Sequence, residues 1–279
     1  MFKVAIEIDI EDLVKKALQV QDKRARDIVV RRYGLKTPQK NTLASLGLEY
    51  GLTRERVRQI EATSLRGIGS KIKEDEQAKK FIKLTEDYLK SVANLRRSDL
   101  LAKDIGILSG LYDGHDQVFE NKLNFLAKVL GRPYVIDATP STYTIWHLDK
   151  SIHDIALSLV KKLLNVKEHN FNKYVIDVID EYDLTESVIL NYLSLSKNFS
   201  IGPYGHMGAD HWLKVNPKTV RDKAYLVLSE SEEPMHFRDI AESVNSISDG
   251  DKASATVHNE LIRDPRFVLI GRGTYSLNE

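Results

Sequence analysis

A helix followed by two short strands recurs three times in this chain, and this repeat constrains the possible folds more than any other feature. The three copies occupy residues 118–146, 186–212 and 255–277, each with a polar turn between its two strands. The second and third copies align without a gap through the helix at a constant offset of 68 residues, so that Asn191 matches Asn259. Repetition at such a period indicates small duplicated domains. A helix that leads into a two-stranded wing is the layout of a winged helix, and we therefore expect three winged-helix domains in tandem.

The predicted fold class is mainly α with small β wings, in which a basic N-terminal domain precedes the three winged-helix domains. Residues 9–35 are predicted to be helical, with a break near Gln21–Asp22 and an end at Gly34. Residues 74–97 are predicted to form one long charged helix. Its expected buried stripe consists of Leu84, Tyr88, Leu89 and Val92. With Asn216–Pro217 as the clearest linker signal, the expected domains are residues 1–73, 74–150, 151–215 and 216–279.

Positive charge is concentrated in one part of the chain, although the net charge of the whole is only +1. Residues 21–73 hold 13 Lys and Arg residues against 5 Asp and Glu residues, whereas residues 74–279 hold 25 against 31. One basic region beside a mildly acidic remainder is expected when one part of a protein meets phosphate and the rest has another role. Contacts with nucleic acid are therefore expected within residues 21–73.

Two helices joined by a tight turn are predicted inside the basic region. A short helix at 42–50 is followed by a turn at Gly51–Leu52, and a second helix runs from Thr53 to about Ile68. Thr53 is expected to cap the second helix, because a threonine hydroxyl accepts hydrogen bonds from the first-turn amides. This arrangement is a helix-turn-helix, whose second helix typically lies in the major groove of DNA.

The helix that begins at Thr53 has two distinct faces, since positions three and four residues apart share a face of an α-helix. One set is apolar or small and is predicted to pack inward: Val57, Ile60, Ser64, Leu65 and Ile68. Another set is predicted to face solvent, flanked by Arg54 and Arg56: Glu55, Arg58, Gln59 and Ala62.

The exposed residues of the first two turns carry groups that recognise base edges. A guanidinium pairs with guanine, an amide with adenine, and a carboxylate accepts a hydrogen bond from cytosine. The preceding helix would cross the DNA backbone, with Lys40 and Thr42 placed to contact phosphate. The alternative is a helical hairpin with a solvated charged face. The predicted DNA-binding residues are Lys40, Thr42, Thr53, Arg54, Glu55, Arg56, Arg58 and Gln59.

Residues 31–35, 42–47 and 52–61 resemble region 4 of the sigma-70 class of bacterial RNA polymerase sigma factors in order, spacing and residue type. The resemblance implies a module that binds double-stranded DNA at the upstream (−35) promoter element and contacts the flap of the polymerase β subunit. We find no counterpart of sigma region 2, so the resemblance does not imply a complete initiation factor. By the resemblance, base reading falls to Arg54, Glu55 and Gln59. Phosphate contacts, or orientation of the reading side chains, fall to Thr42, Arg56 and Arg58.

Residues 217–279 resemble a second family, the HARE-type winged helix, which includes the delta subunit of some bacterial RNA polymerases. The resemblance is carried by residues 224–228, 234–241, 255–261 and 267–277. It implies a winged-helix fold and contact with either DNA or polymerase. The acidic balance of residues 74–279 argues against a large phosphate footprint. A protein-interaction or spacer role for the winged helices therefore stays open.

No pattern of residues in the sequence indicates catalysis, a metal site or a cofactor. The chain has no cysteine, and its one local histidine cluster, at 206–211, has no further ligand at a supporting spacing and is interpreted as a surface wing loop. The acidic run at 177–183 is interpreted as a solvated helix end, and 271–273 as a hairpin turn. No apolar run is long enough to span a bilayer. We therefore expect a non-enzymatic, cytoplasmic protein that is bacterial or phage-encoded and is associated with the nucleoid.

Three functions are compatible with these observations. The first is a sequence-specific transcription regulator that reads DNA and contacts RNA polymerase. The second is a DNA-binding component of a restriction or phage-defence system. The third is a polymerase-binding adaptor that does not bind DNA.

Overall fold

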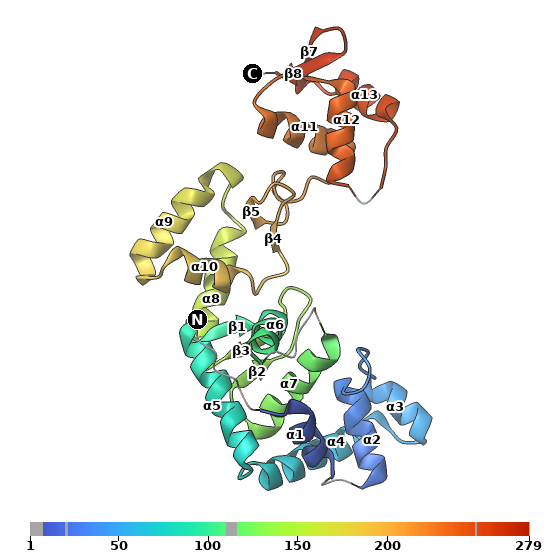
Figure 1. Cartoon of the computed structure of the whole chain (residues 1–279), viewed down its shortest axis with the longest axis vertical. Coiled ribbons are helices and arrows are strands. Elements are labelled where there is room, and N and C mark those ends of the chain that lie inside the picture. The colour runs from blue at the N-terminus through green and yellow to red at the C-terminus, as the bar shows by residue number, and fades with distance from the viewer. Residues whose placement is uncertain (1–7, 20–21, 110–115, 249, 279) are drawn as a thin grey trace. The chain divides into compact units, whose positions relative to one another are not determined.

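The computed structural model of the chain describes residues 8–19, 22–109, 116–248 and 250–278. The described chain is mostly helical, with small antiparallel sheets, which confirms the predicted fold class (Figure 1). It divides into two compact units, Met1–Leu159 with Tyr182–Ser196, and Val160–Glu181 with Lys197–Glu279. Each unit is described by itself.

The N-terminal module of the first unit consists of four helices. They are α1 (Ile10–Gln19), α2 (Lys23–Tyr33), α3 (Leu43–Tyr50) and α4 (Arg54–Ile72). The predicted break lies at the start of α2, where the Asp22 carboxylate accepts hydrogen bonds from the amides of Arg24 and Ala25, each at 3.0 Å. Gly34 ends α2 in the left-handed conformation, as predicted, at φ 62°. Helix α4 continues four residues beyond the predicted end at Ile68.

The predicted single helix at 74–97 is wrong at its C-terminal end. Helix α5 spans Glu76–Ser91, and β1 (Leu95–Arg97) follows after Ala93 and Asn94, which have φ values of 61° and 64°. Two consecutive positive φ values cannot belong to a right-handed helix. The buried face of α5 is formed by Ala78, Phe81, Thr85 and Leu89, while Leu84, Tyr88 and Val92 are only partly buried.

The first winged-helix module runs from α5 to β3 and contains a three-stranded sheet. After β1 come α6 (Ser98–Ser109), α7 (Gln117–Leu130), β2 (Tyr134–Ile136) and β3 (Ile145–His147). Strand β3 lies in the centre and pairs antiparallel with both neighbours, so that the order is β1-β3-β2. The order helix, strand, helix, helix, strand, strand is that of a winged helix, and α7 is its third helix.

One hydrophobic core joins the N-terminal module to the first winged-helix module. Leu13, Val29 and Ile68 from the N-terminal module share this core with Phe125 and Trp146 of the winged helix. Helix α7 contacts α1, α2 and α4, and Figure 1 shows it beside α1 and α4. The two modules therefore pack as one body.

Helix α10 (Glu186–Leu193) belongs to the first unit and packs on β1. The Asn191 side chain donates to the carbonyl oxygens of Val92 and Leu95 at 3.0 and 2.7 Å. Asn191 Oδ1 accepts from Arg96 at 3.0 Å. The Asn191 side chain thus provides hydrogen-bond partners along the free edge of β1, which has no neighbouring strand on that side of its sheet.

The stretch predicted as the second winged-helix domain, 151–215, holds α8 (Lys150–Leu163), a short 3-10 turn at Glu168–Asn170, α9 (Phe171–Tyr182), α10, and the paired strands β4 (Phe199–Ile201) and β5 (Met207–Ala209). Because α10 belongs to the first compact unit whereas β4 and β5 belong to the second, a single second winged-helix domain stays a prediction. The third winged-helix module comprises α11 (Val220–Ser231), β6 (Met235–His236), α12 (Phe237–Ser246), α13 (Ser254–Arg263), β7 (Phe267–Gly271) and β8 (Thr274–Leu277). Its sheet order β6-β8-β7 repeats that of the first module.

Candidate nucleic-acid interface

The turn between α3 and α4 depends on two glycines. Gly51 ends α3 in the left-handed conformation, with φ 62° and ψ 36°, which only glycine adopts without strain. The Leu52 amide donates to the Gly47 carbonyl oxygen at 2.7 Å, and a Cβ at Gly47 would lie 2.7 Å from the Leu52 carbonyl oxygen. These two positions let α4 leave α3 at close range, which gives the predicted helix-turn-helix.

A small apolar cluster holds the helix-turn-helix together. Ile28 of α2, Leu46 of α3 and Val57 of α4 are fully buried against one another. Along α4, Ser64 and Ile68 are also buried, while Ile60 and Leu65 are half-buried. The inward face predicted for this helix is therefore confirmed.

The opposite face of α4 is exposed and polar over its first two turns. Arg54, Glu55, Arg56, Arg58 and Gln59 are all exposed. Arg58 donates to both carboxylate oxygens of Glu55 at 2.8 and 2.7 Å, and Arg56 donates to Gln59 Oε1 at 3.2 Å. The Arg58 hydrogen bonds lower the pKa of the Glu55 carboxyl below its usual value. These five exposed side chains thus form a charged polar surface, which we call the α4 face. Ala62, the last residue predicted for it, is half-buried.

Thr42 and Thr53 cap the two helices of the motif. The Thr53 hydroxyl accepts from the Arg56 amide at 3.1 Å, and the Thr42 hydroxyl accepts from the Ser45 amide at 3.0 Å. The Thr42 hydroxyl also donates to Ser45 Oγ at 3.2 Å. Both threonines therefore have a structural role at a helix N-terminus, which is itself a favourable place for a phosphate.

Lys40 lies apart from the α4 face, in the loop between α2 and α3 and beside α7. A Cβ at Gly34 would lie 3.3 Å from Lys40 Cγ. Partial burial lowers the pKa of the Lys40 ammonium, and the nearby Glu120 of α7 acts in the opposite direction. The predicted residues thus fall into three groups: the α4 face, the two capping threonines, and Lys40.

Ionic contacts that sequence reasoning missed fix α2 against α3. Arg31 of α2 forms a two-pronged ion pair with Glu49, and Arg24 donates to the Tyr50 carbonyl oxygen at 3.0 Å. The Tyr50 hydroxyl donates to Asp27. Arg24, Asp27, Arg31 and Tyr50 line a hollow of about 690 Å³ beside α2. The partners in these contacts lie 18 to 26 residues apart in the chain, so no local sequence pattern indicates that they pair.

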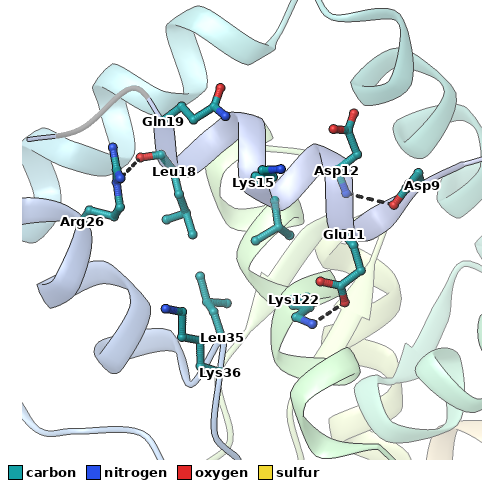
Figure 2. A pocket seen from close by; sticks show the side chains of 11 residues that line it. Asp9, Glu11, Asp12, Lys15, Leu18, Gln19, Arg26, Leu35, Lys36 and Lys122 are labelled. Atoms are coloured by element: carbon teal, nitrogen blue, oxygen red, sulfur yellow. Dashed lines mark hydrogen bonds and ion pairs between the residues drawn. The ribbon is translucent and has the colours of Figure 1, made fainter. Parts of the chain in front are cut away.

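A second hollow, of about 620 Å³, lies between α1, α2 and α7 (Figure 2). Lys122 of α7 points to Glu11 of α1 and forms an ion pair with it, and Arg26 donates to the Leu18 carbonyl oxygen at 2.8 Å. The lining carries the carboxylates Asp9, Glu11 and Asp12 as well as lysines. The hollow thus carries charges of both signs and shares no lining residue with the α4 face.

The histidine cluster at 206–211 has local partners in the second unit. His206 Nε2 lies 2.8 Å from a carboxylate oxygen of Glu230, and the His211 ring packs edge-on against Trp212. Across the residues that the structure describes, no group of three or more acidic or histidine side chains could hold a metal ion. In the same part of the chain, no helix combines the length and apolar character needed to cross a bilayer.

The tight turn, the buried apolar cluster, the capped helices and the exposed α4 face define a helix-turn-helix protein of the DNA-binding type. Comparisons with known proteins agree with this class. Residues 17–68 match the family described as Sigma-70, region 4. Residues 218–279 match the HARE-HTH family, whose description names ASXL and a restriction endonuclease HTH domain. Both resemblances found in the sequence are thereby confirmed.

The similar curated proteins are sigma factors, matched over a short stretch. RNA polymerase sigma factor RpoS of Coxiella burnetii is 43% identical over 58 residues, which is 21% of this chain and 16% of that protein. RNA polymerase sigma factor SigA of Nostoc sp. is 46% identical over 56 residues, 20% of this chain and 14% of that protein. RNA polymerase principal sigma factor HrdD of Streptomyces viridifaciens is 40% identical over 57 residues, 20% of this chain and 16% of that protein. The chain therefore spans only a small part of each relative.

Proposed function

We propose that the chain is a sequence-specific, DNA-binding transcription regulator that reads the major groove with α4 and contacts RNA polymerase. The observation that carries this proposal is the α4 face, where three guanidinium groups, a carboxylate and an amide are exposed at the start of a helix that follows a tight turn. Side chains of these types recognise base edges when they project from the N-terminal half of a recognition helix. Contact with polymerase rests on the similarity to sigma factors.

The proposed roles are those that the resemblance to sigma region 4 implies, and the hydrogen bonds of the α4 face are compatible with them. Arg54, Glu55 and Gln59 contact base edges, while Arg56 and Arg58 contact phosphates or orient the readers, since each is already hydrogen-bonded to a reader in the absence of DNA. The N-termini of α3 and α4, capped by Thr42 and Thr53, face the DNA backbone, with Lys40 as a further phosphate contact. The partner is double-stranded DNA, no cofactor or catalysis is involved, and the protein acts at the nucleoid in the cytoplasm.

Duplex titrations test the DNA-binding part of the proposal. The full chain is titrated into a fluorescent mixed-sequence duplex at several salt concentrations, together with Arg58→Ala, Gln59→Ala and the control Lys83→Ala. Lys83 is an exposed lysine of α5. We expect salt-dependent binding that weakens in Arg58→Ala, while the control binds like the unaltered chain. Equal affinities for all four proteins would contradict the proposal.

Genomic footprinting tests the promoter part. Footprints of the tagged protein are compared with and without inhibition of RNA polymerase. We expect occupancy at promoters, and occupancy spread evenly over the genome would contradict the regulatory role.

One observation favours a different function, a polymerase-binding adaptor without DNA contacts. Ile262, Leu269 and Ile270 of the third winged-helix module are exposed at 62%, 58% and 55%, and exposed large apolar residues mark protein interfaces where they form a continuous patch. A DNA-binding component of a restriction system is favoured by the match of residues 218–279 to a family that includes a restriction endonuclease domain. The adaptor predicts retention on immobilised polymerase that is insensitive to Arg58→Ala.

A further inference from the structure

The third helix of the first winged-helix module is not available to DNA. In the third module the corresponding helix α13 exposes Thr256, Asn259 and Arg263. In the first module nearly all of α7 between Glu120 and Leu130 is buried. A helix whose side chains are enclosed by protein cannot enter a groove, so this module lacks the surface by which helix-turn-helix folds usually bind DNA.

The N-terminal module is what encloses α7. A Cβ at Gly69 of α4 would lie only 2.5 Å from the Val129 carbonyl oxygen, so the two helices approach with no space for a side chain between them. The Tyr33 and Phe125 rings pack edge-on with their centroids 5.4 Å apart. These contacts hold α7 against α2 and α4. Helix α4 is the helix that carries the α4 face.

Asn121 of α7 connects this packing to the loop that precedes α3. Its side chain is fully buried, and Nδ2 donates to the carbonyl oxygens of Gly34 and Pro38 at 3.2 and 3.4 Å. The far end of the loop is tied to α2, where Arg32 donates to the Asn41 carbonyl oxygen at 2.6 Å. The Asn41 amide also donates to the Arg31 carbonyl oxygen at 2.9 Å, so the loop is anchored both in its own module and in the winged helix.

We propose that the first winged-helix module serves as a fixed support for the DNA-reading helices, and that Asn121 is a positioning residue for the 34–42 loop. The proposal rests on the proposed function, since the loop carries Lys40 and ends at Thr42, which caps α3. Asn121 touches no DNA. It sets the position from which Lys40 and the N-terminus of α3 meet the phosphate backbone, because the buried Gly34 carbonyl group would otherwise lose this donor.

The test compares Asn121→Leu with Asn124→Leu in the full chain. Asn124 lies one turn away on α7 and is equally enclosed, but it accepts from Trp146 Nε1 at 2.6 Å and bonds with Ser98, all inside the winged helix. Both substitutions remove buried hydrogen bonds from one helix, whereas only Asn121→Leu releases the loop. Affinity for a mixed-sequence duplex is measured over a range of salt concentrations, well below each variant's unfolding temperature, with Arg58→Ala as the contact variant.

We expect Asn121→Leu to bind DNA about tenfold more weakly than the unaltered chain, with a salt slope that falls by about one phosphate contact. Asn124→Leu should lower the unfolding temperature and leave the affinity and slope of the folded protein unchanged. If Asn121→Leu does not fold, Asn121→Ala removes the same donor with less crowding. Equal DNA affinities for the Asn121 and Asn124 variants would overturn the positioning role, while a lack of effect of Arg58→Ala would instead overturn the proposed function.

Discussion

Arg58 and Glu55 are joined on the exposed side of α4 by two hydrogen bonds of 2.8 and 2.7 Å. Their side chains are 58% and 57% exposed, and an ion pair this exposed contributes little to folding because water and salt screen the attraction. The pair therefore has little structural value and can open at low cost. We interpret it as a preset arrangement of two DNA-contacting groups, in which the carboxylate orients the guanidinium until base edges or phosphates replace it.

Glu55→Gln removes the negative charge of this side chain and keeps its size and shape. The substitution should strengthen binding to mixed-sequence DNA, because it removes a negative charge that faces phosphate. It should also lower discrimination at one base pair by about 1–3 kcal/mol, because the carboxylate that accepts from cytosine is lost. Competition titrations with single-base variants of a selected duplex measure both effects. The control is Glu76→Gln on α5, which removes the same charge from an exposed position away from α4, and identical behaviour of the two variants would refute the assigned role of Glu55.

Thr53→Ala removes the N-cap of the reading helix. The substitution should cost about 1 kcal/mol of stability and should weaken DNA binding as well, since the first turn of α4 carries Arg54 and Glu55. Thr53→Ser keeps the hydroxyl that accepts from the Arg56 amide and should behave like the unaltered chain. Thermal unfolding and duplex titration are the measurements. Thr63→Ala, in the exposed middle of the same helix, is the control, and a serine variant as weak as the alanine variant would contradict the capping role.

Gly69→Ala tests the close packing of α4 on α7. Helix propensity alone would favour alanine by about 1 kcal/mol, whereas a Cβ 2.5 Å from the Val129 carbonyl oxygen forces a shift of backbone that typically costs about 1–3 kcal/mol. We expect the steric effect to prevail and the first unit to unfold at a lower denaturant concentration. Gly250→Ala, where a Cβ would meet nothing within 4 Å, should leave the unfolding midpoint unchanged. A stabilised Gly69→Ala variant would show that α4 and α7 are not tightly packed.

The third winged-helix module should lose stability in acid. Hydrogen bonds from the Arg266 guanidinium lower the pKa of the Asp264 carboxyl below its usual value of 3.8. A carboxyl whose pKa is lower in the folded state contributes stability above its unfolded pKa and loses it as the pH falls through the folded value. Hydrogen exchange of residues 220–277, corrected for the intrinsic effect of pH, should therefore show faster opening below about pH 4. In Arg266→Met the opening should already be faster at neutral pH and should change less with acid; an unaltered pH dependence would contradict this account.

The sequence was sufficient for features set by local periodicity and capping. The inward face of α4, with Val57 and Ile68, follows from the helical repeat, and Thr53 and Gly34 mark helix ends through local hydrogen bonding and a positive φ. The offset between the second and third wings likewise follows from residue order alone. Features of this kind depend on neighbours within a few turns of chain.

Features set by distant partners were missed. Strand β1 was predicted as helix, because Leu95–Arg97 becomes a strand only through pairing with Ile145–His147, some fifty residues later. The burial of α7 was also missed, since an amphipathic pattern identifies an apolar face but not the surface that covers it. Asn121 bonds to Gly34 across 87 residues, so its role in placing the loop could not be found in the sequence.

The most direct test of the central claim is selection of bound duplexes from a random pool, followed by sequencing. The full chain is compared with the double variant Arg58→Ala, Gln59→Ala. The account predicts that the unaltered chain enriches a defined motif and that the double variant loses the preference at the base pairs read by Gln59 and by Glu55, which Arg58 orients. A pool that stays random, or the same motif enriched by both proteins, would contradict the claim that α4 reads DNA.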